Sequence, residues 1–429
     1  MRKKSSFGGG MTFFLKIKFW FVLGIMNVFW LSARQASAIE FTKNHENIDF
    51  SLLTIGRGDA IYALYGHTIL RIVDSDTGLD VGLNWGIFDF HNHLFVWNFY
   101  RGKLRYQMAM LQTKELLDHY RFNEKRAVIE EKIRLSPQQK AKLLERIQWN
   151  LLPENIYYDY EQFKDNCSTR PRDHLDFALH GAIKNRFSNM KTSEKFRDAI
   201  RKGAILVPWV YLGLDQFTND LLDRTMTVWE KMFIPSALRE SLLQMPAIDD
   251  GGQPIEDQNL LYATKILVDL DEPQPKSDPY SIFALLTLIP TSILGAVAIR
   301  FRGKLGLFSL KTLWGFWGFY SGMMGLLLLI NFVVSGYPQL KNWVSLLILN
   351  PLDFYFLGLA IGFFRKNRRW FFKVYIFFRF SMVFFAAYVW ISGVSMQNIV
   401  GTLSTAGVLA VWIFMISFLE GTHEGKSQA

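Results

Sequence analysis

The sequence contains one cysteine, Cys167, which lies in a polar stretch, residues 165–170, that reads DNCSTR. Asn166 is of a residue type that caps helices, and it predicts a helix from there to His180. A thiol in the first turn of a helix faces unpaired backbone N–H groups, which lower its pKa and favour the nucleophilic thiolate. The same N–H groups can bind the oxyanion of a tetrahedral intermediate. We therefore predict that Cys167 is a catalytic nucleophile, with a buried structural cysteine as the alternative.

A thiol nucleophile needs a base, and the sequence offers eight histidines. His67 follows a glycine at the entry to an apolar strand, where a glycine lets another backbone approach closely. His174 and His180 share the predicted helix with Cys167 but lie about two turns or more along it. We predict that His67 is the base, although a histidine beside a sheet can also be a satisfied core residue. The sequence has no His-Glu-x-x-His motif and no cysteine pair, so we expect neither a metal nor a cofactor.

The elements that must position these two side chains can be predicted from composition. Three segments combine β-branched and aromatic residues between turn residues, as strands do. The predicted strands are 50–55, 67–73 and 81–88. Ser136 and Pro137 form the cap and first-position pair of a helix that continues to Trp149. Strands come first and helices later, which predicts an α+β domain with His67 at a strand start and Cys167 at a helix start.

The last third of the chain holds five apolar stretches, each close to the ~20 residues that cross a membrane as a helix. They are Ser281–Ile299, Leu313–Val334, Val344–Phe364, Trp370–Ile391 and Ile399–Leu419. Gaps rich in Lys and Arg alternate with nearly uncharged gaps, so the basic gaps should be cytoplasmic. Counting back places Pro279, and the domain before it, on the outer side. Much of the net charge of +10 lies in these gaps, and we expect no nucleic-acid partner.

The N-terminus has the order of an export signal: basic residues, the apolar run Phe19–Leu31, and a small-residue site at 36–38. It predicts either a signal peptide or an uncleaved anchor, and both place the following domain outside the cytoplasm. The predicted divisions are 1–38, signal or anchor; 39–245, periplasmic catalytic domain; 246–280, a linker rich in Pro, Asp and Gly; 281–419, five transmembrane helices; and 420–429, a cytoplasmic tail. Within the linker, the apolar run Ile266–Leu270 has the composition of a short docked strand.

Three sequence blocks resemble the Lnb N-terminal periplasmic domain family. They are YGHTILR at 65–71, NWGIFDF at 84–90 and DNCSTR at 165–170, and the resemblance covers roughly residues 45–245. It implies a permuted papain-like fold, like that of NlpC-type enzymes and lecithin:retinol acyltransferase, in which the histidine precedes the cysteine. It also implies an inner-membrane, multi-pass lipoprotein N-acyltransferase. Such an enzyme moves a fatty acyl chain from a membrane phospholipid, through a cysteine thioester, to the N-terminal amine of a diacylated lipoprotein.

Papain-like sites contain a third polar residue that orients the histidine, and Asn84 on the next predicted strand is the candidate. A strand-edge asparagine without catalytic role is the alternative. Ser168, Arg170 and Tyr65 are candidates for binding the oxyanion or positioning the substrate, Arg170 through a lipid phosphate. For Arg170 a structural ion pair, and for Tyr65 packing against the sheet, are the alternatives.

Two other classes of protein stay open. The first is a membrane-anchored NlpC-type peptidase or amidase that acts on peptidoglycan with the same cysteine and histidine. The second is a non-enzymatic envelope maturation factor. Polar residues inside the apolar stretches, Arg379, Asn331 and Asp353, raise transport as a further possibility. Arg379 can instead snorkel to the nearby basic cluster, and residues 350–353 can form a helix break.

Overall fold

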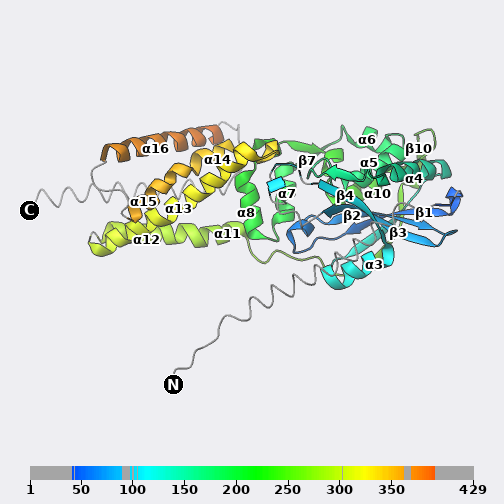
Figure 1. Cartoon of the computed structure of the whole chain (residues 1–429), viewed down its shortest axis with the longest axis horizontal. Helices are drawn as coiled ribbons and strands as arrows, with labels where there is room; N and C mark the ends of the chain where they lie inside the picture. The colour runs from blue at the N-terminus through cyan, green and yellow to red at the C-terminus, as the bar shows by residue number, and fades with distance from the viewer. Residues whose placement is uncertain are drawn as a thin grey trace, which may run out of the picture.

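The computed structural model describes residues 41–42, 44–88, 97–98, 101–103, 105–301, 303–361 and 369–391. A domain of mixed strands and helices occupies one end of the molecule, and long apolar helices occupy the other (Figure 1). The predicted segment 1–38, the fifth apolar stretch and the predicted tail 420–429 lie outside the described residues.

An antiparallel sheet organises the first domain, and within the described residues its strand order is β11-β5-β1-β2-β3-β4-β6. The strands are β1 (Ile48–Ile55), β2 (His67–Asp74), β3 (Leu79–Phe88), β4 (Arg105–Gln112), β5 (Val128–Ile133), β6 (Tyr157–Asp159) and β11 (Leu261–Val268). The three strands predicted from composition are β1, β2 and β3, so this part of the prediction is confirmed. They are neighbours in the sheet, with Ile55 opposite His67 and Ile69 opposite Asn84.

Both faces of this sheet are covered, which explains the nearly continuous apolar sequence of β1. Leu52 and Leu70 face a core that α4, α5 and α10 close, whereas Leu53 and Ile69 face a second core beneath α3 and η4. Successive residues of a strand point to opposite faces, so neighbours along β1 enter different cores.

The helices of this domain are η3 (Ile61–Ala63), α3 (Thr113–Asp118), η4 (His119–Glu124), α4 (Pro137–Leu151), α5 (Thr169–Ala178), α6 (Ala182–Phe187), α7 (Phe196–Ala204), α8 (Pro208–Phe217), α9 (Val228–Lys231) and α10 (Pro235–Leu243), with the shorter η2 (His45–Asn47) and η5 (Asp220–Leu222).

The helix predicted after Ser136 is α4, and its first turn shows why the prediction holds. The Ser136 hydroxyl accepts from the Gln139 backbone N–H at 3.1 Å, and the Gln139 side chain accepts from the Ser136 N–H at 3.0 Å. This reciprocal capping satisfies two backbone donors that have no partner inside the helix.

The segment predicted to be a linker, 246–280, contains three strands, so the linker prediction was wrong there, whereas the short strand predicted at Ile266–Leu270 overlaps the observed β11. It contains β9 (Pro246–Ile248), β10 (Pro254–Asn259) and β11. β9 pairs with β10, and β11 pairs with β5 at the edge of the main sheet. Its Pro, Asp and Gly residues form turns between strands, so a turn-rich composition was mistaken for a flexible connection. A further two-stranded sheet joins β7 (Lys191–Lys195) to β8 (Thr225–Thr227).

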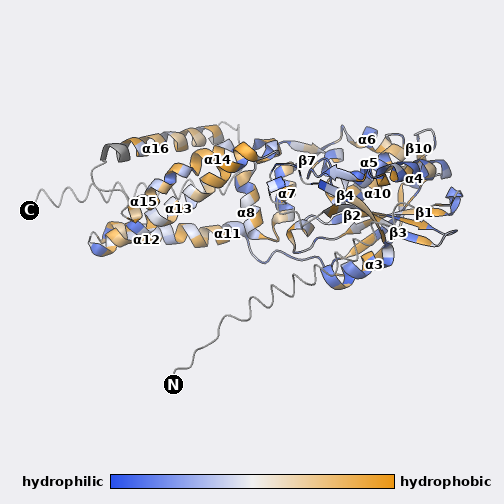
Figure 2. Ribbon diagram, in the orientation of Figure 1, coloured by the Kyte–Doolittle hydropathy of each residue, from blue (hydrophilic) through white to orange (hydrophobic). Residues whose placement is uncertain are grey.

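Among the described residues, three helical segments are long and apolar enough to cross a membrane: Pro279–Arg300, Lys304–Val334 and Pro338–Ala360. Hydrophobic residues predominate along their ribbons in Figure 2, whereas hydrophilic and hydrophobic residues are mixed in the first domain. Their parts are α11 (Pro279–Phe283), η6 (Ala284–Leu288), α12 (Ile289–Arg300), α13 (Lys304–Val334), η7 (Pro338–Leu340), α14 (Trp343–Ile348), η8 (Pro351–Asp353) and α15 (Phe354–Ala360). The fourth predicted stretch forms α16 (Arg369–Ile391), whose described apolar part, Val374–Val389, is shorter.

The polar residues among the apolar helices form a closed cluster. Arg379 is fully buried and donates to both carboxylate oxygens of Asp353, from Nε at 2.7 Å and from Nη2 at 2.8 Å. Its remaining donors bond the carbonyls of Leu347 and Ile348, which the helix break before Asp353 leaves without helical partners. The expectation that Arg379 snorkels was therefore wrong, because the break at 349–353 supplies its partners. These contacts give the pair a structural role in joining α16 to the broken helix.

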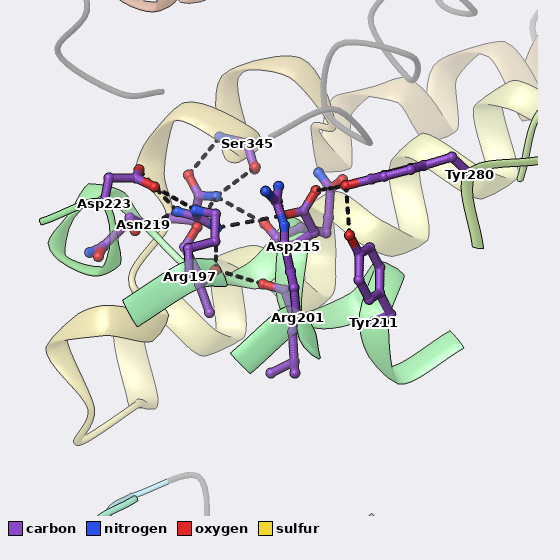
Figure 3. A network of polar contacts seen from close by, with 12 residues as sticks. Arg197, Arg201, Tyr211, Asp215, Asn219, Asp223, Tyr280 and Ser345 are labelled. Carbon is purple, nitrogen blue, oxygen red and sulfur yellow. Dashed lines mark hydrogen bonds and ion pairs between the residues drawn. The ribbon is translucent and has the colours of Figure 1, made fainter. Parts of the chain in front are cut away.

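A second polar network joins the first domain to the apolar helices (Figure 3). Asp215 of α8 is fully buried, and its Oδ1 accepts from Arg201 Nε at 3.0 Å and lies 3.7 Å from Arg197 Nη1. Its Oδ2 accepts from the Tyr280 hydroxyl, in the first apolar helix, at 3.4 Å. Nearby, the Asn342 amide donates to two carbonyls at the end of α8, those of Gln216 at 3.0 Å and Thr218 at 2.8 Å. We call this network the junction.

Candidate functional site

The predicted base, His67, is the first residue of β2 and is hydrogen-bonded to Asn84 of β3. Its Nε2 lies 2.8 Å from Asn84 Oδ1. A carboxamide oxygen can only accept, so Nε2 carries the proton and Nδ1 keeps its lone pair for a second partner. Gly86 lies beside this pair, where an added Cβ would come within 3.1 Å of His67 Cε1. The orientation of the His67 ring is therefore fixed by its bond to the Asn84 amide, and the ring has room because Gly86 has no side chain.

The predicted nucleophile, Cys167, lies two residues before α5 and not inside its first turn, which corrects the predicted helix boundary. Asn166 does cap the helix, but it does so by accepting from the backbone N–H groups of Ser168 and Thr169, at 2.8 and 2.9 Å. The Asn166 amide in turn donates to the Phe233 carbonyl at 2.9 Å. The helix N–H groups expected to bind an oxyanion are thus already occupied by a side chain.

Thr68 links the start of β2 to the segment that carries the cysteine. Its hydroxyl lies 3.2 Å from the hydroxyl of Ser168, the residue after Cys167. The backbone N–H groups of Thr68 and of Cys167 itself both act to lower the thiol pKa, so both lie near the sulfur. The Thr68–Ser168 contact thus joins the residue after His67 to the residue after Cys167.

The electrostatics of the site differ from the prediction. Part of Cys167 reaches solvent, yet protein surrounds the thiol, and burial raises its pKa to about 11. Burial lowers the pKa of His67 to about 4, and the nearby charge of Arg126 acts in the same direction. Burial disfavours the charged form of both groups, so the resting pair is a neutral thiol and a neutral imidazole. The expected depression of the thiol pKa by the helix start was wrong, because burial outweighs it.

The other predicted site residues are placed as follows. Arg170 forms a bidentate ion pair with Asp165 and stacks on the Tyr158 ring, 4.1 Å from its centroid, so its charge is already paired. The Tyr65 hydroxyl donates to the Ile200 carbonyl at 3.0 Å, and its ring packs against Gly203. Ser168 is buried with its hydroxyl on Thr68. In this conformation all three have structural contacts, and their roles in substrate binding stay predictions.

Tyrosines surround the cysteine and were missed in the sequence. Burial raises the pKa of Tyr158 and Tyr160, and the charge of an ionised Cys167 adds to both shifts, so the three side chains are close neighbours. The Tyr160 carbonyl accepts from the hydroxyl of Tyr337, between the second and third apolar helices, at 3.1 Å. Tyr160 therefore lies between Cys167 and the loop that joins the second and third apolar helices. Short strands such as β6, which carries Tyr158, give too weak a pattern to be predicted.

Fold and site together define an α/β domain, attached to membrane-spanning helices, with a cysteine, a histidine and an asparagine at one end of its sheet. Residues 37–199 match the family model of the Lnb N-terminal periplasmic domain, the family that the three sequence blocks resemble. The chain is thus a membrane protein with a periplasmic domain. No curated protein matches the chain, and no solved structure does.

Proposed function

We propose that the protein is a multi-pass lipoprotein N-acyltransferase of the inner membrane. It transfers a fatty acyl chain from a phospholipid to the N-terminal amine of a diacylglyceryl-cysteine lipoprotein. One observation carries the proposal. Cys167, His67 and Asn84 lie at the same end of the sheet, and this part of the domain contacts the helices that can span a membrane. Both substrates are lipids of the membrane, and holding the site beside it raises their effective concentration.

The order of the site residues supports a permuted papain-like arrangement. The histidine lies at the start of a strand, the asparagine on the neighbouring strand, and the cysteine just before a later helix. In such sites the asparagine fixes the tautomer of the histidine, and the histidine acts on the thiol. The bond from His67 to Asn84 is the contact that this mechanism requires.

In the first half-reaction Nδ1 of His67 takes the thiol proton as the sulfur attacks the carbonyl carbon of a phospholipid ester. A carbon–sulfur bond forms, the ester carbon–oxygen bond breaks, and the proton passes from His67 to the departing glycerol oxygen. The products are an acyl thioester on Cys167 and a lysophospholipid. Because the resting pair is neutral, proton transfer and attack occur together, and the N–H groups of Thr68 and Cys167 stabilise the developing negative charge.

In the second half-reaction the lipoprotein amine attacks the thioester carbon. A carbon–nitrogen bond forms, the carbon–sulfur bond breaks, and His67 takes a proton from the amine and returns it to the sulfur. The product is an amide-linked third acyl chain, and the enzyme regains its neutral pair. A thioester serves this step because a thiolate leaves more readily than an alkoxide.

The test is carried out in cells that lack their usual lipoprotein N-acyltransferase. With this gene supplied, N-terminal lipopeptides should carry three acyl chains by mass spectrometry, and Cys167→Ala or His67→Ala should abolish the third. His180→Ala is the matched control, because His180 is an exposed histidine whose ring contacts only Lys142 among the described residues. Triacylated peptides from the Cys167→Ala protein would exclude the thioester. Cleavage of muropeptides by the purified protein would instead establish the peptidoglycan hydrolase.

A further inference from the structure

A buried arginine beside the reaction centre has a terminal nitrogen with no partner. Arg126 lies between η4 and β5 and is only 3% exposed. Its Nε donates to the Gly56 carbonyl at 2.8 Å, and its Nη1 donates to Glu124 Oε2 at 2.6 Å. Nη2 donates to no described residue, although it is buried. A buried cationic donor left open in this way is costly to the fold unless something else binds it.

The position of Arg126 relates this open donor to the candidate site. Gly56 directly follows Ile55, and Ile55 is opposite His67 in the β1–β2 pairing. The guanidinium therefore lies at the same end of the sheet as the histidine. Its charge also acts on the pKa of both His67 and Cys167, which places it within electrostatic reach of each.

The guanidinium is held in place by its neighbours. The Tyr120 ring lies beneath it, 5.4 Å from centroid to Cζ, and the carboxylate of Glu124 is itself bonded by His119 at 3.0 Å and by the Tyr62 hydroxyl at 3.4 Å. A donor fixed by several contacts loses little conformational freedom when it binds a ligand, which favours recognition of an anionic oxygen.

Exposed apolar side chains adjoin this donor. Ile61 and Tyr62 of η3 are 56% and 63% exposed. The segment around η3 lies against α7, since Arg57 Nη1 donates to the Lys202 carbonyl at 3.0 Å. The neighbouring α8 carries the junction and also exposes Trp209, which is 67% exposed. The apolar side chains are thus on elements next to the membrane attachment, where a lipid is the available ligand.

We propose that Arg126 Nη2 binds a phosphate oxygen of the phospholipid acyl donor, while Ile61 and Tyr62 contact the apolar part of the same lipid. The role of the lipid as an acyl donor rests on the proposed acyl transfer. The binding of the lipid to Arg126 can be tested without it. A Cβ at Gly58 would lie 3.1 Å from both Ala63 Cβ and Arg126 Cδ, so the chain that leads into η3 lies against Arg126, and in this proposal it moves outward to admit the phosphate. A bound phosphate offsets the Arg126 charge that acts on His67, which makes the imidazole a stronger base once the substrate is present.

The binding test uses the full-length Cys167→Ala protein in detergent, so that no chemistry occurs. Retention of phosphatidylethanolamine, and of a diacylglycerol with the same chains, is measured by native mass spectrometry. Arg126→Gln should weaken phosphatidylethanolamine binding by about 10- to 100-fold, the loss of a charged hydrogen bond, and leave the diacylglycerol unchanged. Arg172→Gln is the matched control: Arg172 is 4% exposed and donates to Asp173 and Trp229. Equal weakening of both lipids, or no change for either, would overturn the inference.

Two further variants keep the test decisive if Arg126→Gln fails to fold. Arg126→Lys keeps the charge and should retain the preference for phosphatidylethanolamine in weakened form. Ile61→Asp changes an exposed side chain and should weaken both lipids to the same extent, and unchanged binding of both would contradict the apolar contact. A wild-type protein that never forms an acyl-enzyme, yet binds phospholipid through Arg126, would refute the acyl transfer and leave this inference standing.

Discussion

The junction and the reaction centre both bury charged and polar side chains, but they satisfy them to different degrees. At the junction, the carboxylate of Asp215 is in contact with Arg197, Arg201 and Tyr280 (Figure 3). At the reaction centre, burial keeps His67 and Cys167 neutral, and the nearby Arg126 leaves Nη2 without a described partner. The charged groups of the junction are paired, although the buried side-chain amide of Gln216 beside them has no described partner. Paired charges hold a structure in one arrangement, whereas perturbed and open charged groups are available to a substrate.

We infer that the junction attaches the domain to the membrane helices, whereas the reaction centre binds the substrate. The junction, together with the bond from the Tyr337 hydroxyl to the Tyr160 carbonyl, attaches the sheet domain to the apolar helices. The placement of the reaction centre relative to the membrane therefore does not depend on Arg126 Nη2, which can stay open for a ligand.

The largest expected effect is on the stability of the junction. Asp215→Ala removes the carboxylate that Arg201 contacts and leaves Arg197 with Asp223 alone, and should lower the free energy of unfolding by about 3–5 kcal/mol. Thermal unfolding in detergent measures it, and Tyr280→Phe, which removes only one hydroxyl, should cost about 1 kcal/mol. If the Asp215→Ala protein has the same unfolding temperature as the wild type, the junction does not stabilise the fold.

The second effect concerns the protonation of the thiol. Because the pKa of Cys167 is raised to about 11, its alkylation by iodoacetamide at pH 8 should be about 100-fold slower than that of an ordinary thiol. The rate should keep rising with pH up to about 11, since only the thiolate reacts. Cys167 is the one cysteine in the sequence, so the rate reports a single site. A rate that is already at a plateau at pH 7 would show a preformed thiolate–imidazolium pair.

The smallest effect should come from the residue that orients the base. Asn84→Ala removes the acceptor for His67 Nε2 and should slow acyl-enzyme formation by about 10- to 100-fold with little change in stability. Asn84→Asp keeps the acceptor and adds a negative charge that raises the pKa of His67. Because only the neutral imidazole acts as the base, the pH at which activity is lost on acidification should move to a higher value than in the wild type. If both variants have the pH profile of the wild type, Asn84 has only a structural role.

Much of the sheet could be predicted from the sequence, because β1, β2 and β3 are dense in β-branched and aromatic residues and are separated by clear turns. The candidate pairing of His67 with Asn84 followed from adjacent strands, and the two side chains are hydrogen-bonded. β11 could not be predicted as a sheet edge, because its partner β5 lies more than a hundred residues earlier and no local pattern indicates such pairing.

The burial of the Cys167 thiol also could not be predicted from the sequence. A polar stretch around Cys167 indicated an exposed, electropositive thiol, but the folded chain buries the thiol, and burial raises its pKa. Arg126 was missed for a related reason, since its relation to His67 depends on the pairing of β1 with β2. Its sequence neighbourhood resembles that of any charged turn.

The most direct test of the central claim is the mass of the protein after incubation with phospholipid. The purified full-length chain should gain the mass of one fatty acyl group, located on Cys167 by peptide mapping and removed by neutral hydroxylamine, as a thioester is. His67→Ala should gain none, and addition of a diacylated lipopeptide should transfer the group to its N-terminal amine. An unchanged mass at Cys167, with lysophospholipid still produced, would contradict the thioester mechanism.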